Sequence, residues 1–412
     1  MVRRTIQGWA AAAILALPGC TEANPFYQAP DAEADVPGVE GDARVDVAAD
    51  ADSPADGDAD GEADLSAEAD AETDAEADAG PCTAGTTRCT GTTLETCEAG
   101  GTWLARPCIN GCLETGGPHC GVLAPSNLPE RVLGAGTGSL GPSAWSGRPD
   151  TLDIDTDTGE ITAGRDTVRP AGEGLDPDSG IHFRVVAQSG GAPSIGVFAV
   201  GDAEIPDNMT AWVTGDNAFA LVATGAVVVR GTFNCKAWFE STGGPKHPGP
   251  GGGAPGAGPG AGAGGIEDAA DGMLDGGGGG ASFGGQGAAG GYGTIGGAAG
   301  TSYGDPSLVP LWGGSGGGDG WDNPGEGGPG GGACQLVSAL SIVVLAGAGL
   351  DAAGHGGDGA GARGGGGGGG SGGGLLLEAP RVTVAGTLAA NGGGGGAGAE
   401  STTLGGAGGQ LL

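Results

Sequence analysis

Aromatic residues and lysine are scarce in this 412-residue chain. Aromatic side chains make up 4% of the sequence, and the only lysines are Lys236 and Lys246. With so few aromatic residues, we expect no large conventional core. The formal net charge is −35, whereas nucleic acids and anionic membrane surfaces bind clustered lysine and arginine. The composition therefore argues against both as partners.

Motifs that carry enzyme chemistry are also missing. No lysine follows glycine, so there is no phosphate-binding loop, and the four histidines are scattered in loops. Gly354-His355-Gly356 is similar to a motif of β-helical polygalacturonases, but the aspartate pair and the basic motif that accompany it there are absent. Asp351 and Glu378 are the least unfavourable pair of carboxylates for glycoside hydrolysis. We expect no catalytic residue, no cofactor and no enzyme activity.

Residues 1–20 are typical of a bacterial export signal. Arg3 and Arg4 precede an apolar run from Trp9 to Leu17, which is too short to span a bilayer. The run ends Leu17-Pro18-Gly19-Cys20, which resembles a lipobox and implies acylation of Cys20. Ordinary cleavage beside Cys20 is the alternative. Thr21 favours the outer membrane, where palmitate and the other acyl chains would anchor the protein on its periplasmic or surface face.

Residues 21–80 alternate acidic residues with alanine. They hold 20 of the 50 acidic residues against a single base, Arg44. Such a segment cannot bury enough apolar surface to offset its chain entropy, and like charges extend it. We expect a disordered acidic linker that acts as a stalk; an acidic calcium buffer is the alternative.

Residues 81–121 form a cysteine-rich module of about forty residues, a size that usually needs disulfides for stability. The export signal places the module's six cysteines in an oxidising compartment, which predicts three disulfides, with fifteen possible pairings. No C-x-x-C pair is present, so zinc is the weaker interpretation. The cysteines are Cys82, Cys89, Cys97, Cys108, Cys112 and Cys120.

Residues 122–218 contain short alternating runs bounded by turn residues, which indicate strands. The runs are 151–155, 181–186, 195–200 and 209–213, and we expect them to open and cap the fold that follows. Asp153, Asp155 and Asp157 form an acidic series that is a weak calcium candidate. The glycine and the twelfth-position glutamate of an EF-hand loop are misplaced, so an acidic strand face is the simpler interpretation.

Three stretches that begin at Leu221, Leu336 and Leu376 repeat one pattern. Each is a short apolar strand, a turn, a β-branched strand closed by glycine, and then a further apolar residue. Aligned without a gap, they place Val227, Ile342 and Val382 on one face. The repeat predicts an all-β fold of parallel β-helix or β-solenoid type within residues 122–412.

Glycine-rich insertions, at about 240–333 and 354–374, separate the repeats. Residues 241–412 hold 68 of the 100 glycines. We expect the insertions to leave at one corner of successive coils and to pack irregularly, because glycine loses much entropy on ordering and has no strict three-residue period here. Extended polyglycine helices bonded side by side are the alternative. Cys235 and Cys334 flank the longer insertion, which predicts a disulfide.

The stretches LVPLWGGSGGG and GGGGGGSGGGLLLEAPRVTVAGTLAANGGGGG, with the lipobox and the cysteine-rich module, resemble glycine-rich surface lipoproteins of myxobacteria. The resemblance covers most of residues 1–20 and 81–412, and it implies no assigned reaction. Mycobacterial glycine-rich repeat proteins differ, because their N-terminal helical domain is absent here. We expect a structural, adhesive or matrix role in the envelope; binding or processing of envelope or extracellular polysaccharide is the alternative.

Overall fold

The chain is essentially all-β in the computed structural model. No α-helix occurs among the described residues, and none of these residues forms a helix suited to crossing a membrane. The described residues are the backbone of Ala12–Ile14 and residues 82–108, 111–114, 117–129, 132–147, 149–240, 244–267, 275–291, 295–322 and 324–399. The acidic linker and Cys20 lie outside them.

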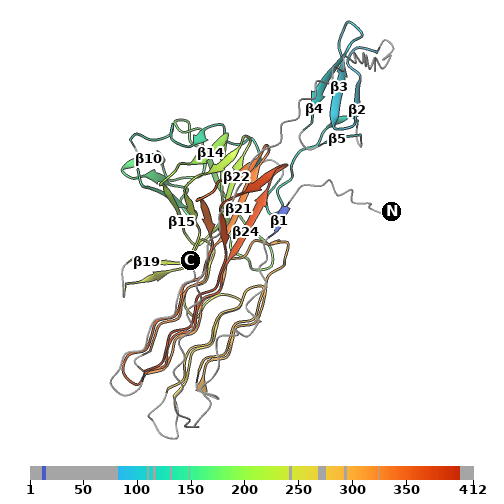
Figure 1. Cartoon of the computed structure of the whole chain (residues 1–412). Coiled ribbons are helices and arrows are strands. Elements are labelled where there is room, and N and C mark those ends of the chain that lie inside the picture. The colour runs from blue at the N-terminus through green and yellow to red at the C-terminus, as the bar shows by residue number, and fades with distance from the viewer. Residues whose placement is uncertain are drawn as a thin grey trace, which may run out of the picture.

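The cysteine-rich module forms its own small sheets, apart from the main body (Figure 1). Strands β2 (Thr87–Thr90), β3 (Thr93–Cys97) and β4 (Trp103–Pro107) make an antiparallel sheet, and β5 (Cys112–Leu113) pairs with β6 (His119–Cys120). The disulfides are Cys82–Cys97, Cys89–Cys112 and Cys108–Cys120.

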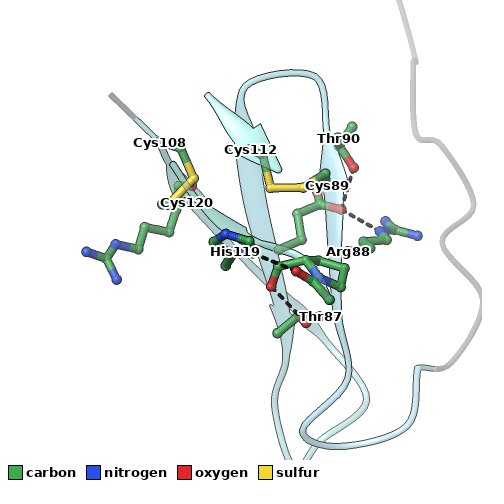
Figure 2. Close-up of a disulfide and its surroundings, with 12 residues drawn as sticks. Thr87, Arg88, Cys89, Thr90, Cys108, Cys112, His119 and Cys120 are labelled. Atoms are coloured by element: carbon green, nitrogen blue, oxygen red, sulfur yellow. Dashed lines mark hydrogen bonds and ion pairs between the residues drawn. A yellow bond between two sulfur atoms is a disulfide. The ribbon is translucent and has the colours of Figure 1, made fainter. Parts of the chain in front are cut away.

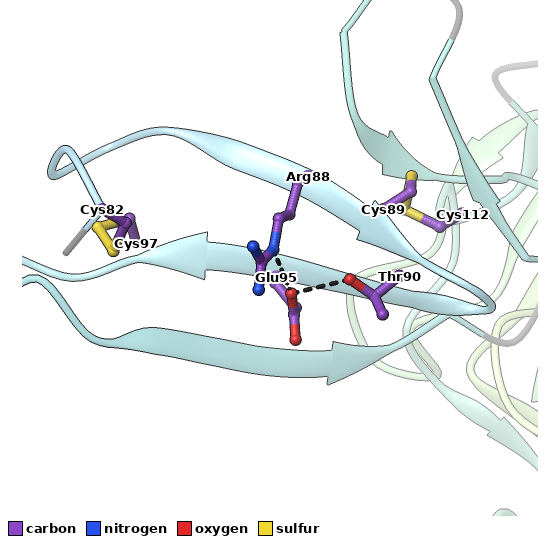
Figure 3. A network of polar contacts seen from close by, with 7 residues as sticks. All are labelled: Cys82, Arg88, Cys89, Thr90, Glu95, Cys97 and Cys112. Carbon is purple, nitrogen blue, oxygen red and sulfur yellow. Dashed lines mark hydrogen bonds and ion pairs between the residues drawn. A yellow bond between two sulfur atoms is a disulfide. The ribbon is translucent and has the colours of Figure 1, made fainter. Parts of the chain in front are cut away.

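Side-chain hydrogen bonds also connect the strands of the cysteine-rich module. Figure 2 shows the Thr87 hydroxyl close to the β5–β6 hairpin, where it donates to the Pro118 carbonyl at 3.3 Å. Figure 3 shows Glu95 accepting from Arg88 at 2.5 Å and from Thr90 at 2.9 Å. These bonds hold the pKa of Glu95 below its usual value, the Arg88 bond most strongly.

Three parallel sheets form the main body, because each turn of the chain adds one strand to every sheet. The strand orders are β13-β16-β21-β24, β14-β17-β22-β25 and β15-β18-β23-β26. The first sheet contains Ile195–Val200, Ala218–Ala223, Ala333–Ser338 and Gly374–Glu378. The second contains Asp202–Ile205, Val227–Val229, Ile342–Val344 and Val382–Val384. The third contains Thr210–Thr214, Thr232–Asn234, Gly349–Asp351 and Thr387–Ala389.

The core lies between these sheets and is built from the inward residues of each strand. Leu221, Val227 and Phe233 belong to one buried cluster, contributed by successive strands of one turn. Phe183, Phe198, Phe219 and Phe233 form a line of rings through it, with successive ring centroids 4.8, 5.7 and 5.4 Å apart. Short strands suffice because each buries its apolar side chains against the strands before and after it.

The register differs from the ungapped alignment in one strand. Leu221 pairs with Leu336 as expected, but Leu336 pairs with Leu377 rather than Leu376. The next strand returns to the expected register, with Ile342 opposite Val382. The corner before β25 is therefore one residue shorter than its counterpart, and the alignment of Leu376 was wrong.

Residues 195–214 form the first complete turn of the body, in the part of the chain that we expect to open it. Phe198 pairs with Leu221 and Ala211 with Phe233, in the same register as the later repeats. The pattern was missed because phenylalanine and alanine replace the leucines of the later turns.

Antiparallel strands close the end where the body begins. They are β9 (Ile161–Ala163), β10 (Asp166–Arg169), β11 (Gly174–Leu175) and β12 (His182–Val186); β7 (Ser139–Leu140) and β8 (Thr151–Asp155) add parallel strands to the second and third sheets. Arg169 is 2% exposed. Its guanidinium donates to the carbonyls of Gly159, Pro170, Gly172 and Gly174, which joins the turns of this cap.

The outer face of the first sheet is covered as well. Val197, Ala220 and Val337 pack with Leu128 and Val132, which precede the body in the chain, and with Leu311. Glu378 is buried on β24 and accepts hydrogen bonds from the amide and hydroxyl of Ser126 and from Gln335. Ser126 and Gln335 thus provide the hydrogen bonds that a buried carboxylate needs.

Strand β24 pairs with β21 on one side and with β1 (Ala12–Ile14) on the other, where β1 runs antiparallel to it. Ala13 lies opposite Leu377. This strand belongs to the segment that the sequence identifies as an export signal.

A matched pair of leucines tests the position of the core. Leu221 is 0% exposed and Leu340 is 45% exposed. We expect Leu221→Ala to lower the free energy of unfolding by about 2–5 kcal/mol, because it leaves a cavity between packed strands. Leu340→Ala should change it by no more than about 0.5 kcal/mol. Urea unfolding monitored by circular dichroism measures both, and equal effects would contradict the assigned core.

Candidate functional surface: the glycine-rich bundle

The glycine-rich insertions leave the body at one corner, between the third sheet and the first. The chain passes from β18 to β21, from β23 to β24 and away from β26 at this same corner. Cys235 and Cys334 are joined in a disulfide at the root of the longer insertion, with their Cα atoms 6.5 Å apart. The common exit expected from the sequence is confirmed.

Beyond the corner, the insertions run side by side as extended segments away from the sheets (Figure 1). We call this set the glycine bundle. Its segments are 249–267, 275–283, 285–291, 295–301, 312–321, 324–332, 352–361, 364–373 and 390–399. The packing is regular, so the expectation of irregular packing was wrong.

Hydrogen bonds between the segments repeat every three residues. The amides of Gly325, Gly328 and Gly331 donate to carbonyls of residues 365, 368 and 371. The amides of Gly354, Gly357 and Ala360 donate in the same way to residues 391, 394 and 397. A left-handed extended helix of three residues per turn produces this period, because it has no internal hydrogen bonds and turns its backbone groups toward its neighbours. The bundle is thus the alternative that the sequence left open.

Glycine is needed here for space. A Cβ atom at Gly368 would lie 2.0 Å from the carbonyl oxygen of Gly279, and one at Gly373 would lie 1.8 Å from that of Gly332. Neither glycine has a positive φ in the left-handed region. The chains are close enough to hydrogen-bond laterally only because these positions lack side chains.

A few side chains are buried inside the bundle, and they hydrogen-bond to its backbone. Ser315 accepts from the Gly260 amide at 2.9 Å and donates to the Tyr303 hydroxyl at 2.9 Å. Ser282 donates to the Gly300 carbonyl at 2.6 Å. Burial raises the pKa of Tyr303 to about 12, so its hydroxyl stays protonated at neutral pH and serves as a donor to Gly313.

Both lysines of the chain form ion pairs with aspartates, and Lys246 does so with the bundle. Lys246 is held at 3.0 Å by Asp358 and donates to the carbonyls of residues 326 and 327, with 4% of its side chain exposed. It lies on β20 (Lys246–His247), which pairs with β19 (Trp238–Phe239). Lys236 lies 3.2 Å from Asp351 at the end of β23.

Some aromatic side chains of the longer insertion pack against one another. The ring of Tyr303 packs edge-on against Trp312, with centroids 5.6 Å apart, and lies 5.0 Å from Phe283. Trp321 is 44% exposed. Tyr292 lies outside the described residues.

The acidic series 153–157 does not converge on a cation site. Asp155 accepts from the amides of Asp157 and Thr158, and Asp157 accepts from the amides of Asp216 and Asn217. Desolvation raises the pKa of Asp153, on β8, above its ordinary value. No group of three or more potential metal-ligating side chains occurs in the part of the chain that the structure describes. Asp155 and Asp157 instead stabilise turns.

The remaining acidic candidates also have structural partners. Asp351, on the third sheet, accepts a hydrogen bond from the Ala353 amide and pairs with Lys236. Glu378, on the first sheet, accepts hydrogen bonds from Ser126 and Gln335. The structure therefore does not bring Asp351 and Glu378 together as a catalytic pair. His355 lies in the bundle, where its amide donates to Pro329 and its ring packs against Phe239.

A matched pair of glycines tests the packing of the bundle. Gly368 is buried, whereas Gly395 is exposed and a Cβ there would lie 3.6 Å from its nearest neighbour, the Gly367 carbonyl oxygen. We expect Gly368→Ala to lower the free energy of unfolding by about 1–3 kcal/mol, because the added methyl forces two backbones apart. Gly395→Ala should leave it nearly unchanged. Thermal unfolding distinguishes them, and an undisturbed Gly368→Ala variant would contradict this packing.

No protein-family model, no curated protein and no solved structure matches this chain.

Proposed function

We propose that this protein is a non-enzymatic lipoprotein of the bacterial cell envelope with a structural, adhesive or matrix role. In this proposal, Cys20 carries the lipid that anchors the chain in the outer membrane. The acidic linker 21–80 separates the membrane from the folded parts. The stacked sheets are a β-solenoid, and this assignment is supported by the parallel pairing of each strand with its counterpart in the next turn. The solenoid displays the glycine bundle.

The bundle carries the functional proposal because most of its polar groups are backbone amides bonded to one another. A catalytic site needs titratable or nucleophilic side chains placed together. The buried side chains of the bundle instead satisfy its backbone. Such a body offers a rigid extended shape, which suits a scaffold or a spacer.

In this proposal, processing at the lipobox also removes strand β1 from the protein. Strand Ala12–Ile14 precedes Cys20, so cleavage at the lipobox would remove it from the edge of β24. The mature lipoprotein would then have an unpaired strand edge on its last turn.

Substitution of Cys20 tests the anchor. In a Gram-negative host that expresses the full chain, metabolic labelling with a palmitate analogue should label the protein and place it in the outer-membrane fraction. Cys20→Ser should lose the label and appear in the soluble fraction. As a control, Thr21→Asp should keep the label but move to the inner-membrane fraction. A labelled Cys20→Ser variant would rule out this anchor.

A glycan array tests the function. We expect the purified full chain to release no reducing ends from any glycan on the array. Binding without turnover would specify the proposal as adhesion to that polysaccharide. Turnover of a bound glycan would replace it with a carbohydrate-active enzyme, and Asp351→Asn and Glu378→Gln would then show whether either carboxylate takes part.

A further inference from the structure

The free end of the glycine bundle carries large side chains that are rare in the rest of the bundle. Figure 1 shows this end, where the segments turn, as the part of the bundle farthest from the sheets. The bundle segments contain two isoleucines and two tryptophans. Trp312 lies beside Gly374, where β24 begins. Ile266, Ile295 and Trp321 all lie at the free end.

Backbone hydrogen bonds hold these three residues next to one another. The Trp321 amide donates to the Gly276 carbonyl at 3.1 Å, and the Gly276 amide donates to the Ile266 carbonyl at 3.1 Å. The Ile266 amide in turn donates to the Ile295 carbonyl at 2.9 Å. On its other side, the Trp321 carbonyl accepts from the Gly365 amide at 2.9 Å. The free end therefore has the same bonded backbone as the rest of the bundle, and this backbone fixes where its side chains begin.

The side chains of the free end are exposed although they are large and apolar. Ile266 is 53% exposed and Trp321 is 44% exposed, and every other described tryptophan is more buried. Apolar residues that are exposed together indicate a binding surface, whereas single exposed ones need no explanation. The hydrogen bonds of this end use the backbone alone, so glycine would serve these positions equally well.

Two further residues of the free end have a strained backbone. The φ angle is 45° at Asp322 and 68° at Arg363, in the left-handed region that glycine adopts without strain. Asp322 follows Trp321, and Arg363 lies two residues before Gly365, which is bonded to Trp321. Neither charged side chain forms an ion pair with a described residue. Strained residues of this kind are concentrated at ligand-binding turns.

We infer that these five residues, which we call the distal cluster, form a binding site for a neutral glycan. The inference rests on the proposed adhesive role and names the surface that performs it. The indole of Trp321 and the side chain of Ile266 offer apolar surface to the C–H face of a sugar ring. The Asp322 carboxylate can accept hydrogen bonds from sugar hydroxyls, and the Arg363 guanidinium can donate to their oxygens.

The charge around the distal cluster selects among ligands. Asp322 and Arg363 have opposite charges, whereas Glu267 and Asp275 lie opposite each other beside Ile266. The free end as a whole is therefore acidic. Like charges repel, so this end disfavours acidic glycans and anionic membrane surfaces and favours a glycan without charge.

The position of the distal cluster also suits binding. Binding residues are common on turns that a rigid scaffold holds in place, and a site that is already ordered loses less conformational entropy when its ligand binds. The bundle holds the cluster away from the sheets (Figure 1). A polysaccharide can therefore reach the cluster without first contacting the body.

Binding of the full chain to an array of neutral glycans tests the inference, with Trp321→Ala as the main variant. We expect this substitution to weaken binding by about tenfold or more, because it removes the apolar surface under the sugar ring. Phe239→Ala is the matched control. Phe239 is also 44% exposed but lies on β19 beside the body, so its variant should bind as the wild type does.

Arg363→Gly separates binding from folding. Glycine adopts the φ of this position without strain, so the variant should unfold at nearly the same temperature as the wild type. Its glycan binding should nevertheless fall by about tenfold, because the guanidinium donors are lost.

Three results would overturn the inference. Glycan binding that is unchanged in both Trp321→Ala and Arg363→Gly would leave an adhesive role but place it elsewhere on the chain. No binding to any neutral glycan would remove the site, whereas the proposed anchor would still be decided by the labelling of Cys20. Binding to phosphatidylcholine vesicles that Trp321→Ala abolishes, without glycan binding, would assign the distal cluster to a membrane.

Discussion

The distance between neighbouring backbones in the glycine bundle is the constraint on which this structure depends. Adjacent segments are close enough for amide and carbonyl to bond directly, and a single Cβ at Gly365, Gly369 or Gly372 would lie within about 2 Å of a neighbour's carbonyl oxygen. This proximity leaves no place for side-chain chemistry in the interior. The exceptions, such as Ser282 and Ser315, lie where a small hydroxyl can join the backbone network.

Such a bundle cannot rely on its own contacts for stability. Ordering a residue costs about 1–2 kcal/mol of backbone entropy, and glycine loses the most. A hydrogen bond contributes a net 0.5–1.5 kcal/mol or so, and glycine buries almost no apolar surface. The deficit is offset by fixing where each segment begins and ends. The sheets hold the roots of the segments, Cys235–Cys334 closes the longer insertion and Lys246 binds the side of the bundle.

Much of the body could be predicted from the sequence, because its strands carry a visible period. The second strand of each repeat alternates inward and outward residues, with Val227, Val229, Ile342 and Val344 inward. The glycine-rich insertions begin at the same point after each repeat, which locates the corner. The exact register could not be predicted at Leu375-Leu376-Leu377, since a run of identical residues fits two alignments equally well. The turn at 195–214 was hidden for another reason: the core accepts Phe198 where later turns have leucine. The core selects apolar side chains rather than one residue type, since Ala211 lies opposite Phe233 in the same cluster.

The bundle could not be recognised by the rule that identifies collagen, and the reason is geometric. In collagen only one residue in three faces the crowded axis, so glycine recurs with that period. Segment 364–373 has neighbours on nearly every side, so all three positions of its helix are crowded and its glycines are consecutive. The three-residue period survives in the hydrogen bonds while it disappears from the sequence.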